Sequence, residues 1–318
     1  MVQADVGRSG GNDRRPILVL VGPTASGKTS LSLELARRFP LEIVNLDASQ
    51  LYVGMDIGTA KPSAAERAEI PHHLFDVSMP DRPLNAGVYA GLADQLIAPI
   101  LERGRWPLFV GGTGLYAKAL LFGLATIPEV PAAIRDSIIG RMKQEGSAAL
   151  HARLAEVDPV TARRLPPADT QRISRALEVF EATGTPISAF QEEHRFQVPR
   201  YRYLKLCVQW PRPVLRQRIV ERVPGMFEAG FVREVEALLA SGYPPELRTF
   251  KALGYREVIE HLEGRSTLSE CIERVTLRHL QYARRQETWF NRESDSERLA
   301  PPFGKRAVEI AGSFLEQA

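Results

Sequence analysis

The stretch with the most recognisable chemistry reads Gly-Pro-Thr-Ala-Ser-Gly-Lys-Thr and begins at Gly22. It matches the G-x-x-x-x-G-K-[ST] pattern of a phosphate-binding loop, in which backbone N–H groups turn toward an anion. Lys28 adds a full positive charge, and the Thr29 hydroxyl is a candidate ligand for Mg²⁺. The pattern does not say whether the ligand is a diphosphate or a triphosphate such as ATP. The expected phosphate-binding residues are Gly22, Pro23, Thr24, Ala25, Ser26, Gly27, Lys28 and Thr29.

A second chemical group, the carboxylate of Asp47, follows the apolar segment 41–46. The carboxyl ends of parallel strands form the binding edge of an α/β sheet, so we expect Asp47 beside the phosphate loop. A carboxylate there can be a magnesium ligand or a helix N-cap. It can equally be a general base, or an acceptor for a substrate amine or hydroxyl, and spacing alone does not choose between these roles.

Short apolar segments predict the strands of a parallel sheet, at 16–21, 41–46, 72–77, 106–110 and 203–208. Helical spacing of apolar residues predicts helices at 31–39, 85–103, 213–223, 231–240, 252–262 and 267–290. The paired histidines at 72–73 point to opposite faces of a strand, which argues against a shared metal ion.

The pattern changes near Ile127, where proline becomes frequent and strand signals stop. Helices are predicted at 131–145, ended by Gly146, and at 171–183, ended by Gly184. The chain is therefore expected to be an α/β protein with a P-loop NTPase-like parallel sheet flanked by helices and an all-helical insertion domain. The expected parts are a disordered tail at 1–15, a catalytic core at 16–126 and 200–318, and the insertion domain at 127–199.

Composition is that of an ordinary globular protein, with 318 residues, 44% of them apolar and 25% charged. The net charge of +3 permits an anionic partner without requiring one. Cys207 and Cys271 form no C-x-x-C pair, so no zinc or iron–sulfur motif is expected and a reducing cytoplasm suits the chain. No apolar run approaches the length that spans a membrane.

Two predicted helices carry basic residues that suit nucleic acid. The last long helix interleaves arginines, among them Arg284 and Arg285, with Trp289 and Phe290, a pattern for phosphate contacts and base stacking. On the helix 171–183 the polar face carries Gln171, Arg172 and Arg175. Taken alone, a solvated helix face with a packed tryptophan explains the C-terminal pattern slightly better.

With these motifs in order along nearly the whole chain, the sequence resembles the bacterial tRNA dimethylallyltransferases, also called tRNA isopentenyltransferases. The matching stretches are residues 22–29, 47–52, 55–62, 110–116, 171–175, 253–256 and 284–290. The resemblance implies transfer of a dimethylallyl group from its diphosphate to N6 of the adenosine 3′ of the anticodon. It implies tRNAs that read codons beginning with U, and Mg²⁺ as cofactor. We expect no protein partner and a monomeric chain.

The resemblance also assigns roles to residues. Asp47, Thr113 and Arg222 are implied to be catalytic, with Asp47 taking the N6 proton and Arg222 binding the diphosphate. The insertion domain is implied to bind the anticodon arm. The implied tRNA contacts are Asp47, Ala48, Ser49, Gln50, Thr113, Arg135, Gln171, Arg172, Ile173, Ser174, Arg175, Arg256, Arg284, Arg285 and Trp289.

One departure from the family pattern is Pro224, which stands where an acid is usual in the stretch that begins at Arg222, so the local helix start is expected to differ. The nearest competing reading is an adenylate isopentenyltransferase, which uses a free nucleotide; the helical insertion and residues 171–175 favour tRNA. A small-molecule kinase would need a lid with paired arginines, and a GTPase would need Asn-Lys-x-Asp. Neither feature is found.

Overall fold

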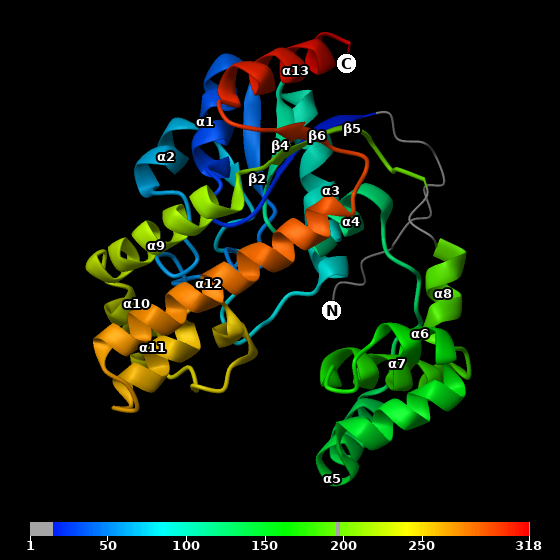
Figure 1. Cartoon of the computed structure of the whole chain (residues 1–318). Helices are drawn as coiled ribbons and strands as arrows, with labels where there is room; N and C mark the ends of the chain where they lie inside the picture. Colours follow the sequence, from blue (N-terminus) through cyan, green and yellow to red (C-terminus); the bar gives the residue numbers. More distant parts are fainter. Residues whose placement is uncertain (1–14, 195–197, 318) are drawn as a thin grey trace. The chain divides into compact units, whose positions relative to one another are not determined.

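A computed structural model describes residues 15–194 and 198–317 of the chain (Figure 1). The expected tail lies outside the described residues, apart from Arg15. The chain divides into two compact units. The insertion unit runs from Phe122 to Val198, whereas the sequence pattern placed it at 127–199, and the catalytic unit is formed by the chain on either side of it.

Within the described residues, one parallel sheet has six strands in the order β3-β2-β4-β1-β5-β6. The strands are β1 (Pro16–Val21), β2 (Leu41–Asn45), β3 (His72–His73), β4 (Trp106–Gly111), β5 (Arg202–Val208) and β6 (Glu297–Leu299). The central strand β1 is buried along most of its length, which is why its sequence is apolar throughout instead of alternating. The predicted α/β class with a parallel sheet is confirmed.

The strand register brings the chemically interesting loops to one edge of the sheet. Val21, the last residue of β1, pairs with Gly111 at the end of β4 and with Cys207 near the end of β5. Asn45, at the end of β2, pairs with Val110. The phosphate loop after β1, the Asp47 loop after β2 and the glycine turn after β4 therefore leave the sheet side by side.

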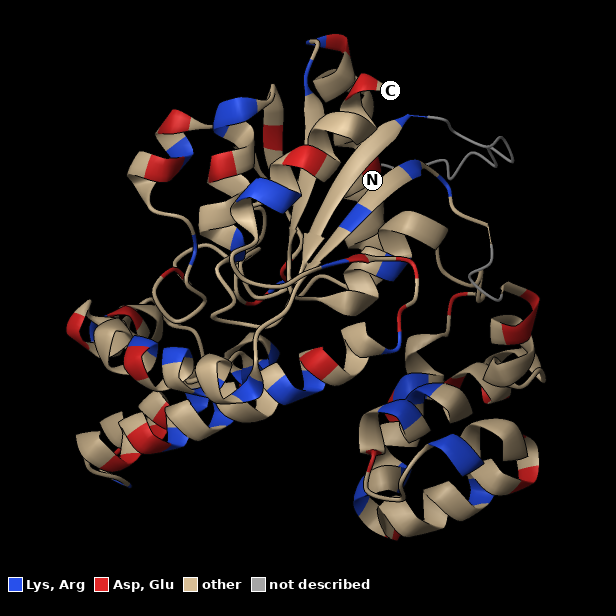
Figure 2. Ribbon diagram, turned by 45° about the horizontal axis from the view of Figure 1, so that its top comes forward, with Lys and Arg blue, Asp and Glu red and all other residues tan. Residues whose placement is uncertain are grey.

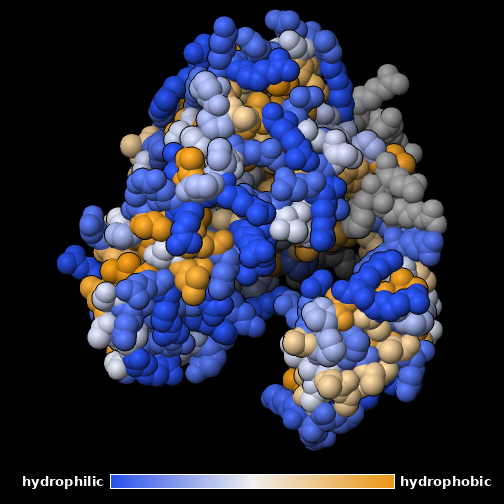
Figure 3. All heavy atoms as spheres, viewed as in Figure 1, coloured by the Kyte–Doolittle hydropathy of each residue, from blue (hydrophilic) through white to orange (hydrophobic). Residues whose placement is uncertain are grey.

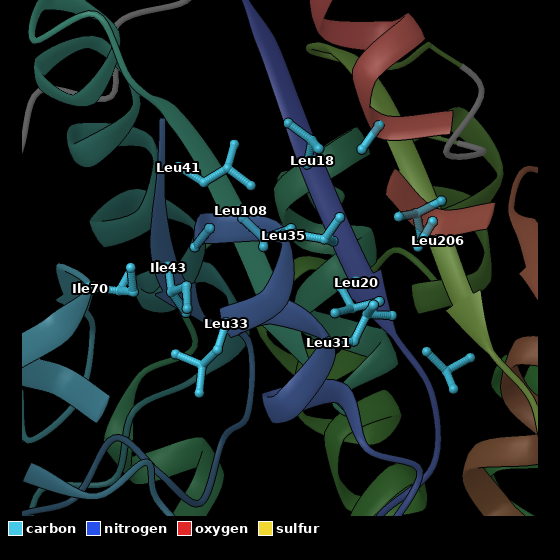
Figure 4. Packing of buried hydrophobic residues seen from close by; sticks show 14 of the residues in the cluster. Leu18, Leu20, Leu31, Leu33, Leu35, Leu41, Ile43, Ile70, Leu108 and Leu206 are labelled. Carbon is cyan, nitrogen blue, oxygen red and sulfur yellow. The ribbon is translucent and has the colours of Figure 1, made fainter. Parts of the chain in front are cut away.

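Helices cover the sheet and extend beyond it (Figure 1). Those connecting or flanking the strands are α1 (Lys28–Arg38), α2 (Ala64–Glu69), α3 (Ala86–Glu102), α4 (Gly114–Phe122) and α13 (Gly304–Glu316). Buried leucines of α1, such as Leu31 and Leu35, pack on Leu18, Leu20 and Leu206 of the sheet (Figure 4). Burying each such side chain contributes about 1.5–3 kcal/mol.

A second cluster of helices in the catalytic unit has its own apolar core. It consists of α9 (Arg212–Glu228), α10 (Phe231–Ala240), the 3₁₀ helix at Arg248–Lys251, α11 (Tyr255–Leu262) and α12 (Leu268–Asn291). Phe231, Tyr255 and Val275 are fully buried in this core. A capping box is present at the start of α12, with Thr267 and Glu270 bonding each other's backbone N–H groups.

Two expectations about local structure were wrong. The strand predicted at 72–77 ends at His73, because Leu74 and Asp76 have positive φ values of 60° and 56° that no strand accommodates. The helix predicted to end at Val223 runs through Pro224 to Glu228, so Arg222 lies within α9 and not at a helix start. Val223 and Met226, on either side of the proline, are both buried, and this packing outweighs the lost hydrogen bond.

The insertion unit is helical throughout its described part, with α5 (Ala132–Val157), α6 (Pro159–Arg164), α7 (Thr170–Thr183) and α8 (Ile187–His194). As expected, Gly146 ends the helical segment predicted at 131–145: its φ of 83° is not helical, and a second helical segment of α5 follows directly after this kink. Asp158 and Asp169 cap α6 and α7 through their side chains, and Gly184 ends α7 with φ of 69°. The core of the unit includes Ile138, Leu150, Leu154, Ile173 and Leu177.

No described helix combines the length and apolar character needed to cross a membrane. The face drawn in Figure 3 is mostly hydrophilic, with apolar side chains in scattered groups.

Candidate active site

A cavity of about 730 Å³ lies at the edge where the three loops leave the sheet. The phosphate loop supplies one wall, the Asp47 loop and Thr113 supply another, and side chains of α9 and α12 complete it. All of these elements belong to the catalytic unit. The cavity thus places cationic and carboxylate groups from distant parts of the sequence around one space.

The phosphate loop is folded around Lys28. Its Nζ donates hydrogen bonds to the carbonyl oxygens of Gly22 at 3.0 Å and Pro23 at 2.7 Å. Gly27, with φ of 89°, adopts a left-handed conformation that turns the chain into α1. Burial lowers the pKa of the Lys28 ammonium to about 8, and the nearby carboxylate of Asp47 opposes that shift.

This lowered pKa predicts a pH-dependent affinity for a diphosphate. A bound anion favours the ammonium form, so affinity reaches its full value only well below pH 8, where Lys28 is already fully charged. Above pH 8, binding must also take up a proton, and affinity is expected to fall by up to about tenfold per pH unit. Titration with inorganic diphosphate between pH 7 and 9.5 at constant magnesium measures this. Lys28→Met removes the titrating group and should flatten the slope, and a wild-type affinity that is constant to pH 9.5 would contradict the prediction.

Side chains from other elements fix the outer side of the phosphate loop. Trp210 Nε1 donates to the Ser26 carbonyl and Arg218 Nε donates to the Ala25 carbonyl, both at 2.8 Å. The hydroxyl of Ser26 is buried and has no hydrogen-bond partner among the described residues, although Ser26 lines the cavity. A buried hydroxyl without a partner is costly, so this oxygen is well suited to bond a ligand oxygen.

Arg222 lies on α9 about two hundred residues beyond the loop in sequence, yet lines the same cavity. Its Nη1 donates a long hydrogen bond of 3.4 Å to Thr24 Oγ1. Burial lowers the pKa of the guanidinium, and the charge of Asp47 opposes this. Among the described residues Arg222 has no ion-pair partner within 4.0 Å, so its charge is available for an anionic ligand.

Asp47 lies two residues beyond β2 and lines the cavity. Its Oδ1 accepts hydrogen bonds from the Ser49 N–H at 3.0 Å and the Ser49 hydroxyl at 2.6 Å. Asn45 holds the Asp47 backbone, accepting its N–H at 2.8 Å and donating to its carbonyl at 3.0 Å. Among the described residues nothing donates to Oδ2. One carboxylate oxygen therefore fixes the local turn and the other remains for a substrate.

The glycine turn after β4 packs directly against the Asp47 loop. A methyl group on Gly111 would lie 2.2 Å from the backbone of Leu46, so only glycine fits. The Thr113 hydroxyl accepts the Ala48 N–H at 3.0 Å, and the Thr113 N–H reaches the Leu46 carbonyl at 3.3 Å. Thr113 thus positions the backbone on both sides of Asp47.

Comparison with known proteins decides the family to which this chain belongs. Residues 50–293 match the protein-family model described as IPP transferase. A tRNA dimethylallyltransferase of Geobacter metallireducens is 47% identical, with 89% of this chain and 92% of the relative covered. The corresponding protein of Geobacter sulfurreducens is 48% identical, covering 87% and 89%. This chain belongs to the IPP transferase family.

Solved structures agree with that assignment. The tRNA isopentenylpyrophosphate transferase of Bacillus halodurans is 33% identical and superposes with a TM-score of 0.70, covering 96% of this chain and 98% of that one. A eukaryotic dimethylallyltransferase acting on tRNA is 26% identical with a TM-score of 0.81, covering 95% and 80%.

Most of the residues that the sequence singled out meet at the cavity. Gln50 lines it, although its Nε2 donates to the Thr59 and Ala60 carbonyls at 2.9 and 3.1 Å and so holds a neighbouring loop. Arg256, Arg284 and Trp289 are not among its lining residues. The predicted residues that line the cavity are Thr24, Ala25, Ser26, Gly27, Lys28, Thr29, Asp47, Ala48, Ser49, Gln50, Thr113, Arg222 and Arg285.

Trp289, predicted to contact tRNA, is held by protein contacts. Its Nε1 donates to Glu293 Oε1 at 3.0 Å, and Lys118 Nζ lies 5.3 Å from the ring centroid. A methyl group on Gly114 would lie 2.0 Å from the same Nε1, so the indole rests directly on the start of α4. The side chain is 38% exposed. Trp289 is therefore the packed tryptophan that the alternative of a solvated helix face predicted, and part of its surface is accessible.

The remaining predicted tRNA contacts lie in the insertion unit. Arg172 Nε bonds Asp169 at 2.7 Å, and Arg175 Nη1 lies 3.5 Å from Glu178. Ile173 is fully buried in the core of the unit, so its side chain is not available to RNA in this conformation, contrary to the expectation. Gln171 and Arg135 are exposed and Ser174 is half-buried. Figure 2 shows basic residues both on the insertion unit and along α12.

Sequence reasoning missed three cavity residues on the inner face of α12. His279 Nδ1 bonds the Val275 carbonyl at 2.9 Å, and burial lowers the pKa of His279 to about 4, so it is neutral. Burial raises the pKa of the Tyr282 phenol. Gln286 is 5% exposed and bonds two loops. Counted from buried Val275, the successive spacings to His279, Tyr282 and Gln286 are four, three and four residues, which puts these polar groups on one buried face of the helix. This pattern is the signal that could have identified them.

Proposed function

We propose that this protein transfers a dimethylallyl group from dimethylallyl diphosphate to N6 of an adenosine in tRNA, releasing diphosphate. The adenosine is the one 3′ of the anticodon in tRNAs that read codons beginning with U. The observation that carries the proposal is the single cavity in which a cationic phosphate loop faces the carboxylate of Asp47. The names of the relatives support tRNA as the acceptor, and we propose that the protein acts in the cytoplasm.

In the proposed reaction the diphosphate half of the donor binds at the phosphate loop. The N6 lone pair attacks the allylic carbon, the carbon–oxygen bond breaks, and its electrons leave with the diphosphate. Lys28, Arg222 and the N–H groups at the start of α1 stabilise the developing negative charge. The residues present also fit magnesium. Thr29 is exposed in the cavity, so its hydroxyl is accessible to the ion.

Such a site suits Mg²⁺, which keeps several waters and binds mainly through substrate phosphates. When bound through the Thr29 hydroxyl it would supply further positive charge to the leaving diphosphate. The rest of the stabilisation comes from the protein's own cations.

The acceptor half of the reaction depends on Asp47. An exocyclic adenine amine is a poor nucleophile because its lone pair is delocalised into the ring. Asp47 Oδ2 accepts the N6 proton as the new carbon–nitrogen bond forms. Thr113 and Asn45 hold the backbone on either side, so the carboxylate has one orientation. A stacked adenosine cannot enter a cavity of this kind, so the base must be flipped out of the anticodon loop.

The direct test is to incubate the protein with unmodified tRNA and dimethylallyl diphosphate, digest the RNA, and identify nucleosides by mass. We expect one adenosine to gain the five carbons of the dimethylallyl group. Modification of free adenosine monophosphate in preference to tRNA would instead indicate an adenylate isopentenyltransferase. Phosphate transfer from ATP would indicate a kinase, and either result would overturn the proposal.

The exposed face of α7 provides a test of RNA binding. Removing the charges of Arg172 and Arg175 with glutamine should weaken tRNA binding and reduce the slope of affinity against salt concentration by up to about 2, because phosphate neutralisation releases counterions. Diphosphate affinity should be unchanged. The measurement is a tRNA titration at several salt concentrations.

The matched control for the α7 variant is Lys305→Gln with Arg306→Gln, which removes the same charge from exposed positions of α13. Wild-type affinity and slope in the α7 variant would mean that this face is merely solvated.

A further inference from the structure

The side-chain amide of Gln286 connects the two halves of the active site. Its Oε1 accepts the backbone N–H of Thr24 in the phosphate loop at 2.8 Å. Its Nε2 donates to the carbonyl of Gly112 in the glycine turn at 2.9 Å. The two partners are 262 and 174 residues away in sequence. Because an amide has one acceptor end and one donor end, Gln286 serves both loops at once.

Because the Thr24 N–H is bonded to Gln286, it is not available to bind a phosphate oxygen. The phosphate loop therefore presents its later N–H groups, beyond Thr24, to a bound diphosphate. Arg222 also reaches Thr24, through its hydroxyl. Thr24 is thus held from α12 on one side and from α9 on the other, which fixes where the loop and its leaving group lie.

The Gly112 end leads to the catalytic carboxylate through backbone contacts. Gly112 is followed by Thr113, which bonds the backbone of Leu46 and Ala48, the residues on either side of Asp47. A displacement of the glycine turn therefore moves Asp47. The contact is close: a methyl group on Gly112 would lie 2.1 Å from Gln286 Nε2. Apart from the neighbouring residues of the chain, the next nearest atoms to that methyl are the side-chain amide carbon of Gln286 at 3.3 Å and the Gly22 carbonyl oxygen at 3.4 Å.

From these contacts we infer that Gln286 is a positioning residue for prenyl transfer, setting the distance between the diphosphate loop and the acceptor-side Asp47 loop. It touches neither reacting atom; it acts through Thr24 and through the Gly112–Thr113 turn. The inference rests on the proposed function. Its consequence is that loss of the amide should damage the chemical step more than the binding of either substrate alone, because each loop keeps its own ligand contacts.

The first test is Gln286→Met, which keeps the length of the side chain and removes both hydrogen bonds. With both substrates saturating and the temperature well below the melting point of the variant, the single-turnover rate should fall about 10²-fold, the typical effect of misplacing reacting groups by about 1 Å. Affinities for inorganic diphosphate and for tRNA, measured separately, should stay within about threefold of wild type, far less than the rate effect. Gln281→Met, on the exposed side of the same helix, is the matched control and should behave as wild type.

The second test leaves Gln286 in place and displaces its amide. Gly112 does not have positive φ, so its backbone accepts alanine, whose methyl group would push Nε2 away from the Gly112 carbonyl. Gly112→Ala should reproduce the loss of rate with substrate affinities kept. Combined with Gln286→Met, it should cause little further loss, because both changes break the same connection.

The outcomes separate this inference from the proposed function. A wild-type protein that does not prenylate tRNA overturns the proposed function, whatever the variants do. If wild type is active, a normal single-turnover rate in folded Gln286→Met overturns the positioning role. A loss of rate that weaker diphosphate or tRNA binding explains would also overturn the positioning role. The same conclusion would follow if the rate losses of Gln286→Met and Gly112→Ala multiplied in the double variant.

Discussion

Asp47→Asn is expected to fold, to bind both substrates within a few-fold of wild type, and to transfer the prenyl group at least about a hundred times more slowly. Asparagine keeps an Oδ1 that can accept the two hydrogen bonds from Ser49, and the Asn45 contacts involve only the Asp47 backbone. The turn should therefore survive. What the amide cannot do is take a proton at the position of Oδ2, and loss of a general base typically costs about 10²–10⁴-fold.

The measurement is single-turnover prenyl transfer with tRNA and dimethylallyl diphosphate saturating. Asp81→Asn, at an exposed position, is the matched control and should retain the wild-type rate. A near-normal rate in Asp47→Asn would remove Asp47 from the role of base. Intact chemistry with a large loss of diphosphate affinity would instead make it a magnesium ligand, the alternative that spacing alone left open.

Lys28→Ala is expected to have an effect of similar size on a different step. Removing a charged partner of a bound anion typically costs about 2–5 kcal/mol of binding free energy. Because about 1.4 kcal/mol is a factor of ten, diphosphate affinity should fall by at least about 30-fold and turnover should nearly cease. The loss includes the two hydrogen bonds from Nζ to the Gly22 and Pro23 carbonyls, which shape the loop around the ligand.

Lys28→Met tests whether charge or packing is responsible, since it keeps the aliphatic stem without the ammonium group. It should lose nearly as much diphosphate affinity as the alanine variant. Titration with inorganic diphosphate gives both values directly, and Lys305→Ala, on exposed α13, serves as the control. If the diphosphate affinity of Lys28→Ala equals that of wild type, Lys28 does not take part in this site.

The sequence alone determined the elements whose information is local. A glycine loop between an apolar strand and a helix needs no distant contact to be recognised, and the same holds for the end of α7 at Gly184. The position of Asp47 at the same edge as the loop followed from one topological rule for parallel strands. These features are encoded within about ten residues each, so reading them required no knowledge of packing.

Only the tertiary structure decided which distant residues complete the site. The local sequence pattern could not show that α9 continues through Pro224. The helix continues because Val223 and Met226, on either side of the proline, are buried in the apolar core. Nor could the pattern show that Trp289 rests on Gly114 or that Gln286 joins Thr24 to Gly112. The contacts of Trp289 and Gln286 link segments more than a hundred residues apart. Because the packing of whole elements selects such partners, the sequence predicted the phosphate loop and the Asp47 loop as separate features. It could not predict the side chain that connects them.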